Sequence, residues 1–371
     1  MATAGNGIAR GETLTQYGKA LRALRKSIEQ PSHERTRTAL ACCILFYCFE
    51  AALGNSEAAM HHLQSGLGLL ATYQRDQKHR ESDDLYALSR VFDVLDLQAT
   101  LFHDERIPFL VLTTEEERET GMSDLLCTDG FTRFDDAYQA LVKLQNWLFH
   151  FLTKNMPYKS HTGEATLAPI LEEKGCLTKW FDRWMTKFDN LKNQTGQSDQ
   201  MACGTQTLLI HWQVSCMLLE ADYPTDESVF GASPNLRAEE VLSLASNMLE
   251  STAKENGVAE IAKGPRRKFS SETGVIAPLF TLAMKCSDEH VCNRATELLA
   301  NSQRREGLYD AGSMATIIHQ FKMARQQKEV RSEGYGVEEI GNISLEKMFA
   351  LELDSVTGGM DKMAKFTKPT T

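Results

Sequence analysis

The chain has 371 residues, 42% hydrophobic and 24% charged, with a formal net charge of −10 at pH 7, which is typical of a globular protein with one large or two ordinary domains. The acidic balance argues against a nucleic-acid-binding surface, which needs clustered Lys and Arg. The sequence contains no run of 18 or more apolar residues, so we do not expect a membrane-spanning helix. The segment Met1 to Gly11 is small and polar and lacks the apolar core of a secretory signal.

The first two predicted helices differ in how their apolar residues are distributed. The helix over 12–29 has one apolar face, with residues at spacings of three and four, opposite a face with Lys and Arg. After Pro31, a helix over 33–53 is apolar on nearly all sides, which is typical of a central helix that must be covered on every side. The segment 1–11 offers little cover. We therefore expect an incomplete folding unit that exposes apolar surface or associates.

A tight turn joins the second helix to a third. Gly54 suits a left-handed C-terminal cap, and the next two residues suit the N-cap of a helix over 56–73. Leu63 lies on the apolar face of that helix. The neighbouring His61 and His62 project about 100° apart, so they cannot chelate one metal ion together. Packing or a hydrogen bond is therefore the expected role of His62.

Helical periodicity continues along most of the remaining chain. The segments with apolar residues at helical spacing are 85–102, 134–151, 177–191, 208–219, 236–255, 274–286, 288–302 and 311–329. The acidic stretch 103–131 interrupts them and is expected to form a long surface loop. We find no strand alternation in the first 330 residues and no self-similarity at a period of about 34 residues, which argues against a regular helical solenoid.

The predicted fold class is all-α, an irregular array of antiparallel helical hairpins with about 10–12 helices. The predicted organisation is a disordered N-terminus over 1–11, a helical domain over 12–330 and an irregular C-terminal tail over 331–371.

The nine cysteines do not form a metal-binding pattern. Their number is odd, and no Cys-x2-Cys pair occurs. We interpret them as small buried hydrophobic residues of a protein from a reducing compartment, and we expect no metal site and no cofactor in this chain.

Aromatic residues concentrate in the middle helices and leave two interpretations open. The first is ordinary core packing. The second is a pocket among helices for a small-molecule effector. The candidate pocket residues are Trp147, Phe151, Trp180, Trp184 and Trp212.

Two further motifs have simple structural explanations beside their functional ones. Asp135-Asp136-x-x-Gln139 is similar to the acidic metal motif of all-α terpene synthases, but no second acidic motif follows, and a helix N-terminus explains both aspartates. The basic run 263–268 is either a nuclear-import signal or a solvated loop.

Three segments together resemble the regulatory, or middle homology, region of fungal Zn2Cys6 zinc-cluster transcription factors. They are the hairpin over 49–70, the segment Leu88-x3-Phe92-x2-Leu95-Asp96-x-Gln98, and Arg304-Arg305-Glu306-Gly307-Leu308-Tyr309-Asp310. The resemblance covers roughly residues 14–330, and Tyr309 stands where the family usually has Trp. The motif positions, to which we assign structural roles, are Gly54, His62, Leu63, Asp96, Gln98, Arg305, Glu306 and Gly307.

The resemblance implies a nuclear regulator of RNA polymerase II transcription, with cytoplasmic presence as an alternative, and no enzymatic activity. The sequence lacks the family's six-cysteine zinc cluster, so zinc is expected only in an absent N-terminal domain and direct DNA binding by this chain is not expected. Expected partners are a second copy, a coactivator or corepressor, and a small-molecule effector, with no membrane contact. The alternative is a non-DNA-binding helical interaction scaffold derived from the same fold.

Overall fold

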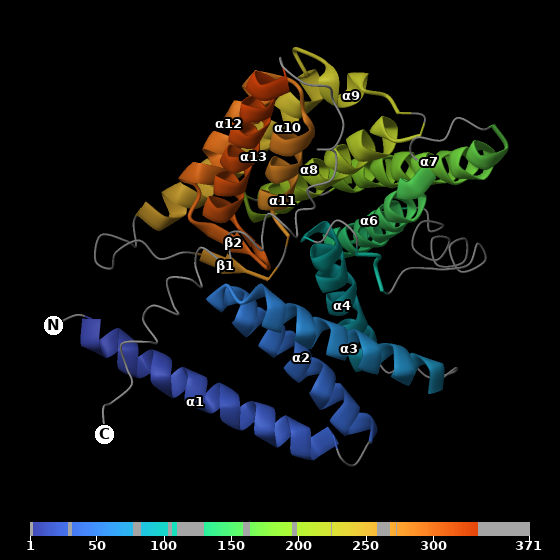
Figure 1. Cartoon of the computed structure of the whole chain (residues 1–371). Helices are drawn as coiled ribbons and strands as arrows, with labels where there is room; N and C mark the ends of the chain where they lie inside the picture. Colours follow the sequence, from blue (N-terminus) through green and yellow to red (C-terminus); the bar gives the residue numbers. More distant parts are fainter. Residues whose placement is uncertain are drawn as a thin grey trace. The chain divides into compact units, whose positions relative to one another are not determined.

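The chain forms an all-α array of helices with one very small sheet (Figure 1). The computed structural model describes residues 3–28, 32–76, 83–102, 106–109, 130–158, 164–194, 199–223, 225–257, 268–271 and 273–332. The chain divides into two compact units, 1–95 and 96–371, at a position where the sequence indicated no boundary.

The first unit contains α1 (Thr3–Ile28), α2 (His33–Leu53), α3 (Ser56–Asp76) and the first part of α4 (Asp83–Phe102). Helix α1 starts well before residue 12, so the prediction that 1–11 is disordered is wrong for residues 3–11. Helix extension is cooperative and adds one hydrogen bond per residue, which allows a small polar segment to continue a helix that is already formed.

The α2–α3 hairpin has the turn that its sequence indicates. Ser32 caps α2 by accepting a hydrogen bond from the backbone N–H of Arg35 at 3.3 Å. At the other end, Gly54 has φ 84° and donates to the carbonyl of Ala51 at 3.0 Å, a left-handed cap that glycine adopts without strain. The side chain of Asn55 then accepts from the N–H of Ala58 and starts α3.

Leu63 provides a direct stability test of this hairpin. Its side chain is completely buried, whereas the neighbouring Gln64 is exposed. We expect Leu63→Ala to lower the free energy of unfolding by about 2–5 kcal/mol, because it removes buried surface and leaves a cavity. The matched surface change Gln64→Ala should stay within about 0.5 kcal/mol. Chemical denaturation of both variants measures the difference, and equal effects would mean that the other face of α3 is buried.

Helix α2 also has the length and apolar composition of a membrane-spanning segment over Glu34–Leu53. The same composition fits a core helix, and in the structure α2 packs against α1 and α3 with Leu40 and Tyr47 fully buried.

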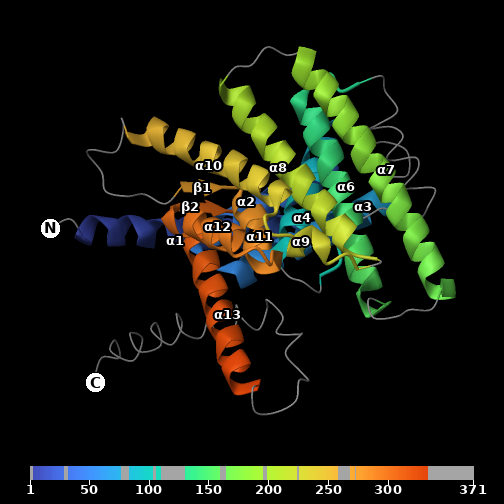
Figure 2. The same ribbon diagram turned by 90° about the horizontal axis from the view of Figure 1, so that it is seen from above.

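In the second unit, three long helices run side by side and contact one another (Figure 2). They are α6 (Phe134–Asn155), α7 (Glu164–Gln194) and α8 (Asp199–Ala221), with the short η1 (Met156–Tyr158) after α6 and α9 (Ser228–Gly231) after α8. Helix α10 (Leu236–Gly257) packs on α8, and α11 (Ile276–Lys285), α12 (Glu289–Asn301) and α13 (Ala311–Ser332) pack on one another.

Three strands form a sheet that the sequence did not predict. Strand β1 (Lys268–Ser270) pairs in parallel with β2 (Arg304–Glu306), and β2 pairs antiparallel with β3 (Tyr309–Asp310). The expectation of no strands before residue 330 is therefore wrong. Strands of two or three residues are too short to show an alternating pattern, which needs about four residues or more. The expected tail over 331–371 lies outside the described residues, except for 331 and 332.

Candidate functional site

Three polar side chains from distant parts of the sequence hold the segment 270–276, of which all but residue 272 is described. We call Gln98, His211 and Glu306 the polar clamp. Gln98, on α4, donates from Nε2 to the carbonyl of Ser271 at 2.7 Å. His211, on α8, donates from Nε2 to the carbonyl of Gly274 at 2.7 Å. Both side chains are buried, whereas Ser271 is exposed and Gly274 is half-buried.

Glu306 accepts three hydrogen bonds at the start of α11. Its carboxylate takes the N–H groups of Gly274 at 3.0 Å, Val275 at 3.2 Å and Ile276 at 2.9 Å. These are donors that a helix N-terminus leaves without a partner inside the helix. Burial raises the pKa of Glu306, whereas the nearby guanidinium of Arg304, at 3.4 Å, and the three amides favour the charged form.

Gly307 makes the turn between β2 and β3 beside Gln98. Its φ is 55°, in the left-handed region, and its N–H donates to the carbonyl of Ser270 at 2.7 Å. A Cβ atom at this position would overlap Oε1 of Gln98 and come within 3.0 Å of its Cδ. The close approach of the β2–β3 turn to the side chain of Gln98 therefore requires glycine at this position.

The two remaining motif residues of this unit pair with oppositely charged side chains. Asp96 is fully buried, forms an ion pair with Arg106 and accepts from the N–H of Phe109 at 2.6 Å. Arg305 pairs with Asp310 at 3.1 Å. The five motif positions of this unit thus contact backbone groups or oppositely charged side chains of the protein, and these contacts hold backbone segments in place.

His211 gives the polar clamp a pH dependence. Burial lowers the pKa of His211, against the opposing effect of hydrogen bonds to the backbone of Gly274 and Thr273. Below about pH 6.5, the unfolded chain therefore binds a proton that the folded protein does not, and stability falls as the pH decreases. We expect His211→Gln to be less stable at neutral pH. Its free energy of unfolding, measured from denaturation curves, should nevertheless fall less between pH 7 and pH 5 than that of the parent protein. Parallel curves for the two proteins would contradict this assignment.

Sequence reasoning gave no signal for His211. Its other ring nitrogen faces Nε2 of Gln145 at 3.5 Å, and Gln145 also donates to Ser215 at 3.0 Å, so α6 and α8 share a buried polar contact. His211 and Ser215 lie one helical turn apart on α8, Gln145 precedes His211 by 66 residues, and none of the three belongs to a motif.

The candidate pocket residues lie in the α6–α8 layer and contact other protein groups. Trp184 is fully buried, stacks on Phe188 and donates from its indole N–H to the carbonyl of Ala137 at 2.8 Å. The indole of Trp147 donates to Glu173 at 2.9 Å.

The other three candidate aromatics differ in exposure. Phe151 is completely buried and contacts the ring of Tyr223. Trp212, half-buried, donates to the carbonyl of Phe181 at 3.1 Å. Trp180 is half-buried under the guanidinium of Arg183. Trp180 and Trp212 are thus the members of the set with surface left for a ligand.

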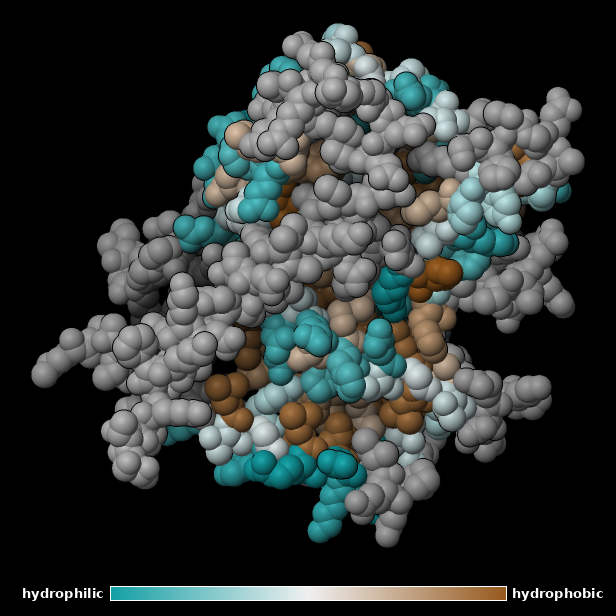
Figure 3. All heavy atoms as spheres, viewed as in Figure 1, coloured by the Kyte–Doolittle hydropathy of each residue, from teal (hydrophilic) through white to brown (hydrophobic). Residues whose placement is uncertain are grey.

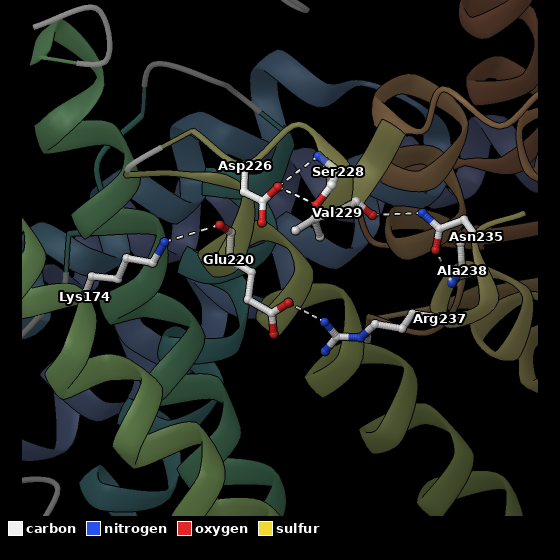
Figure 4. Close-up of polar contacts among 8 residues, drawn as sticks. All are labelled: Lys174, Glu220, Asp226, Ser228, Val229, Asn235, Arg237 and Ala238. Carbon is white, nitrogen blue, oxygen red and sulfur yellow. Dashed lines mark hydrogen bonds and ion pairs between the residues drawn. The ribbon is translucent and has the colours of Figure 1, made fainter. Parts of the chain in front are cut away.

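A second polar cluster fixes the end of α8 (Figure 4). Lys174, on α7, donates from Nζ to three backbone carbonyls, those of Glu220, Asp222 and Tyr223, at 3.3, 2.5 and 2.7 Å. Burial lowers the pKa of Lys174, and the neighbouring acidic residues oppose that shift. A lysine at a helix C-terminus complements the helix dipole. The cluster is another that sequence reasoning missed.

Asn235 and Arg237 continue this cluster toward α10 (Figure 4). The side-chain oxygen of Asn235 accepts from the N–H of Ala238 at 3.1 Å and so caps α10, while its amide donates to the carbonyl of Val229. Arg237 forms an ion pair with Glu220.

In the first unit, the motif residues lie at the α2–α3 hairpin. Nε2 of His62 faces the hydroxyl of Tyr17 at 2.8 Å, and its ring packs against Phe46. Asn55 donates to the buried carboxylate of Glu50 at 3.0 Å. These contacts tie α1 to the hairpin.

Among the described residues, no group of three or more His, Cys, Asp or Glu side chains could hold a metal ion. Among the described cysteines, four are buried as expected (Cys43, Cys216, Cys286 and Cys292), three are half-buried (Cys42, Cys48 and Cys176), and Cys203 is exposed. Asp135 and Asp136 occupy the first turn of α6. The basic run 263–268 lies outside the described residues apart from Lys268, whose backbone belongs to β1.

The fold thus defines an all-α protein whose motif residues stabilise helix ends and turns. No family model and no solved structure matches the chain. It is 21% identical to the aspercryptin biosynthesis cluster-specific transcription regulator atnN of Emericella nidulans over 88% of its own length and 64% of that protein. The chain therefore spans less than two thirds of the relative, and the similarity supports a distant relation to a fungal transcription regulator.

Proposed function

We propose that this chain is the helical, effector-sensing region of a fungal RNA polymerase II transcription regulator. The observation that carries the proposal is the similarity to a fungal transcription regulator over 88% of the chain. The all-α fold is consistent with it, and the polar clamp gathers residues that the sequence motifs single out. The proposed location is the nucleus, and the proposed role is regulatory rather than enzymatic.

The proposed effector is a small molecule that contacts the α6–α8 layer. Trp180, on α7, and Trp212, on α8, are half-buried, and Trp212 links the two helices through its hydrogen bond to Phe181, so a ligand there would contact aromatic surface without opening the core. Coactivator or corepressor proteins, or a second copy of the chain, are the proposed macromolecular partners. Zinc belongs, in this proposal, to a cluster outside this chain.

A reporter assay tests the regulatory role. We expect the chain, fused to a heterologous DNA-binding domain in a fungal host, to raise or lower expression of a reporter severalfold relative to the DNA-binding domain alone. The buried-site variant Leu63→Ala should weaken the effect, and the surface variant Gln64→Ala should retain it. Unchanged reporter expression from a fusion that accumulates normally would contradict the proposal and favour a helical scaffold.

A separate prediction concerns DNA. Because the chain carries a net charge of −10 and no Cys-x2-Cys pair, we expect it to bind DNA only non-specifically, with Kd no tighter than about 10⁻⁶–10⁻⁴ M near physiological salt. Fluorescence anisotropy with labelled duplexes of different sequence measures this. A sequence-selective nanomolar complex would contradict it.

A further inference from the structure

One side of α2 remains exposed although it is apolar. Leu45 is 66% exposed, and the neighbouring side chains on the same helix face are Ala41, Cys42, Cys48 and Ala52, which are half-buried or exposed. We call these five residues the apolar stripe. They follow the spacing of one helix face, since each lies three, four or seven residues from Leu45. Phe49, also four residues from Leu45, is half-buried and stacks on Tyr17 of α1, so it forms the covered edge of this face. The opposite face of α2 is in the core.

The apolar stripe has the shape of a helix-binding surface. Four of its five side chains are small, and Leu45 projects at its centre. Small residues let a second helix approach closely, and one large side chain can insert between residues of that helix. Figure 3 shows hydrophobic side chains in the lower part of the view, where Figure 1 draws α1, α2 and α3, with hydrophilic side chains along the lower edge.

The charge around the apolar stripe is opposite to that of the whole chain. Residues 1–53, up to the end of α2, contain seven Lys or Arg and four Glu, a formal charge of +3 in a chain of −10. The exposed basic side chains among the described residues of α1 and α2 are Lys19, Arg22, Arg25, Lys26, Arg35 and Arg37, and the exposed acidic ones are Glu12 and Glu34. A partner that is apolar on one side and acidic at its edges would match both features.

Three other occupants fit less well. Nucleic acid would use the basic side chains but would leave the apolar stripe without a role. Membrane-surface helices insert bulky Trp, Phe or Leu side chains, whereas four residues of this stripe are small. A second copy would bring two positively charged surfaces together.

We propose that the apolar stripe of α2, with the basic side chains of α1 and α2 beside it, binds an acidic amphipathic helix of a partner protein. The helix lays its apolar side along Leu45, and its acidic side chains meet the basic residues. This binding proposal rests on the proposed regulatory function and adds to it the kind of partner, an acidic amphipathic helix. Its test measures binding alone and no transcription, so either proposal can fail separately.

The binding test uses the full chain and a designed peptide. The probe is a fluorescent helical peptide of about 20 residues with Leu at positions i, i+3, i+4 and i+7 and Glu elsewhere. A scrambled peptide of identical composition is the control. Anisotropy titrations should show saturable binding of the amphipathic peptide, weaker binding at higher salt and much weaker binding of the scrambled peptide. Equal binding of both peptides, or of neither, would overturn the proposal.

Matched variants locate the surface. Leu45→Glu and Arg25→Glu should each weaken peptide binding about tenfold or more, equivalent to about 1.4 kcal/mol. The controls Leu236→Glu, at a side chain that is 76% exposed on α10, and Lys179→Glu, exposed on α7, should bind like the parent protein. Circular dichroism verifies folding, and Leu45→Gln repeats the test without a new charge. Equal weakening by the controls would show that only net charge matters and would overturn the assignment to α2.

Two further measurements separate the rival occupants. Sedimentation velocity that finds a dimer dissociated by Leu45→Glu would replace the proposed partner with a second copy. Flotation with anionic lipid vesicles that Leu45→Glu abolishes, without binding of the peptide, would replace it with a membrane surface.

Discussion

Glu306→Ala is expected to lower the free energy of unfolding by about 3–6 kcal/mol. The reason is that one carboxylate accepts from three consecutive backbone N–H groups, two of them on residues that are completely buried. Each buried donor left without a partner costs about 1–3 kcal/mol, and Arg304 loses its neighbouring negative charge as well.

Glu306→Ala is expected to destabilise the start of α11 more than the rest of the protein. Amide hydrogen exchange at Gly274, Val275 and Ile276 should accelerate more than exchange in the middle of α8, because the start of α11 loses its acceptor. Glu306→Gln keeps one acceptor oxygen, so its free energy of unfolding should lie between those of the parent protein and the alanine variant. Glu297→Ala is the matched control, since its side chain is 58% exposed and pairs only with Arg294 at the surface. Equal denaturation midpoints for Glu306→Ala and Glu297→Ala would refute the role given to the carboxylate.

The helices of this protein could be predicted because their apolar spacing is a local property of the sequence. The predicted helix over 33–53 has the same bounds as α2, and the start of α3 follows from the glycine cap and the polar residues behind it. The small sheet could not be found in the same way. Its strands have two or three residues, and β1 pairs with a strand more than 30 residues away.

The polar clamp could not be predicted from local sequence patterns, for a different reason. The motifs pointed to Gln98 and Glu306 individually, yet nothing in the spacing shows that the two side chains hold the same segment. His211 belongs to no motif, and a single histidine on an apolar helix gives no signal of its partner. Lys174 is similar, because the carbonyls that it binds belong to the end of another helix. Contacts of this kind depend on tertiary packing, which a single sequence does not display.

For the aromatic residues, sequence composition could not distinguish a pocket from a core. Burial now separates them, because Phe151 and Trp184 are completely buried whereas Trp180 and Trp212 retain exposed surface. The effector hypothesis is accordingly narrowed to two tryptophans. In the first unit, the helix over 33–53 needed cover on every side, and the structure leaves the side with Leu45 exposed.

Gly307→Ala is expected to lower the free energy of unfolding by about 2–5 kcal/mol, for two reasons that can be separated. The first is backbone strain, because φ of 55° costs a residue with a Cβ about 1–2 kcal/mol. The second is the overlap of the new Cβ with Oε1 of Gln98. To make room, Gln98 must move and lose its hydrogen bond to the carbonyl of Ser271, which leaves buried polar groups without partners at about 1–3 kcal/mol.

A double-mutant cycle with Gln98→Ala divides the two contributions. In the Gln98→Ala background the overlap is gone, so Gly307→Ala should cost only the strain of about 1–2 kcal/mol, and the two changes should be less than additive. Gly68→Ala is the matched control, since a Cβ there meets open space on α3 and alanine should stabilise the helix by about 0.5–1 kcal/mol. Urea denaturation of the four proteins of the cycle gives the coupling. If Gly307→Ala costs the same with and without Gln98, the packing of these two residues does not set the requirement for glycine, and backbone strain alone must account for it.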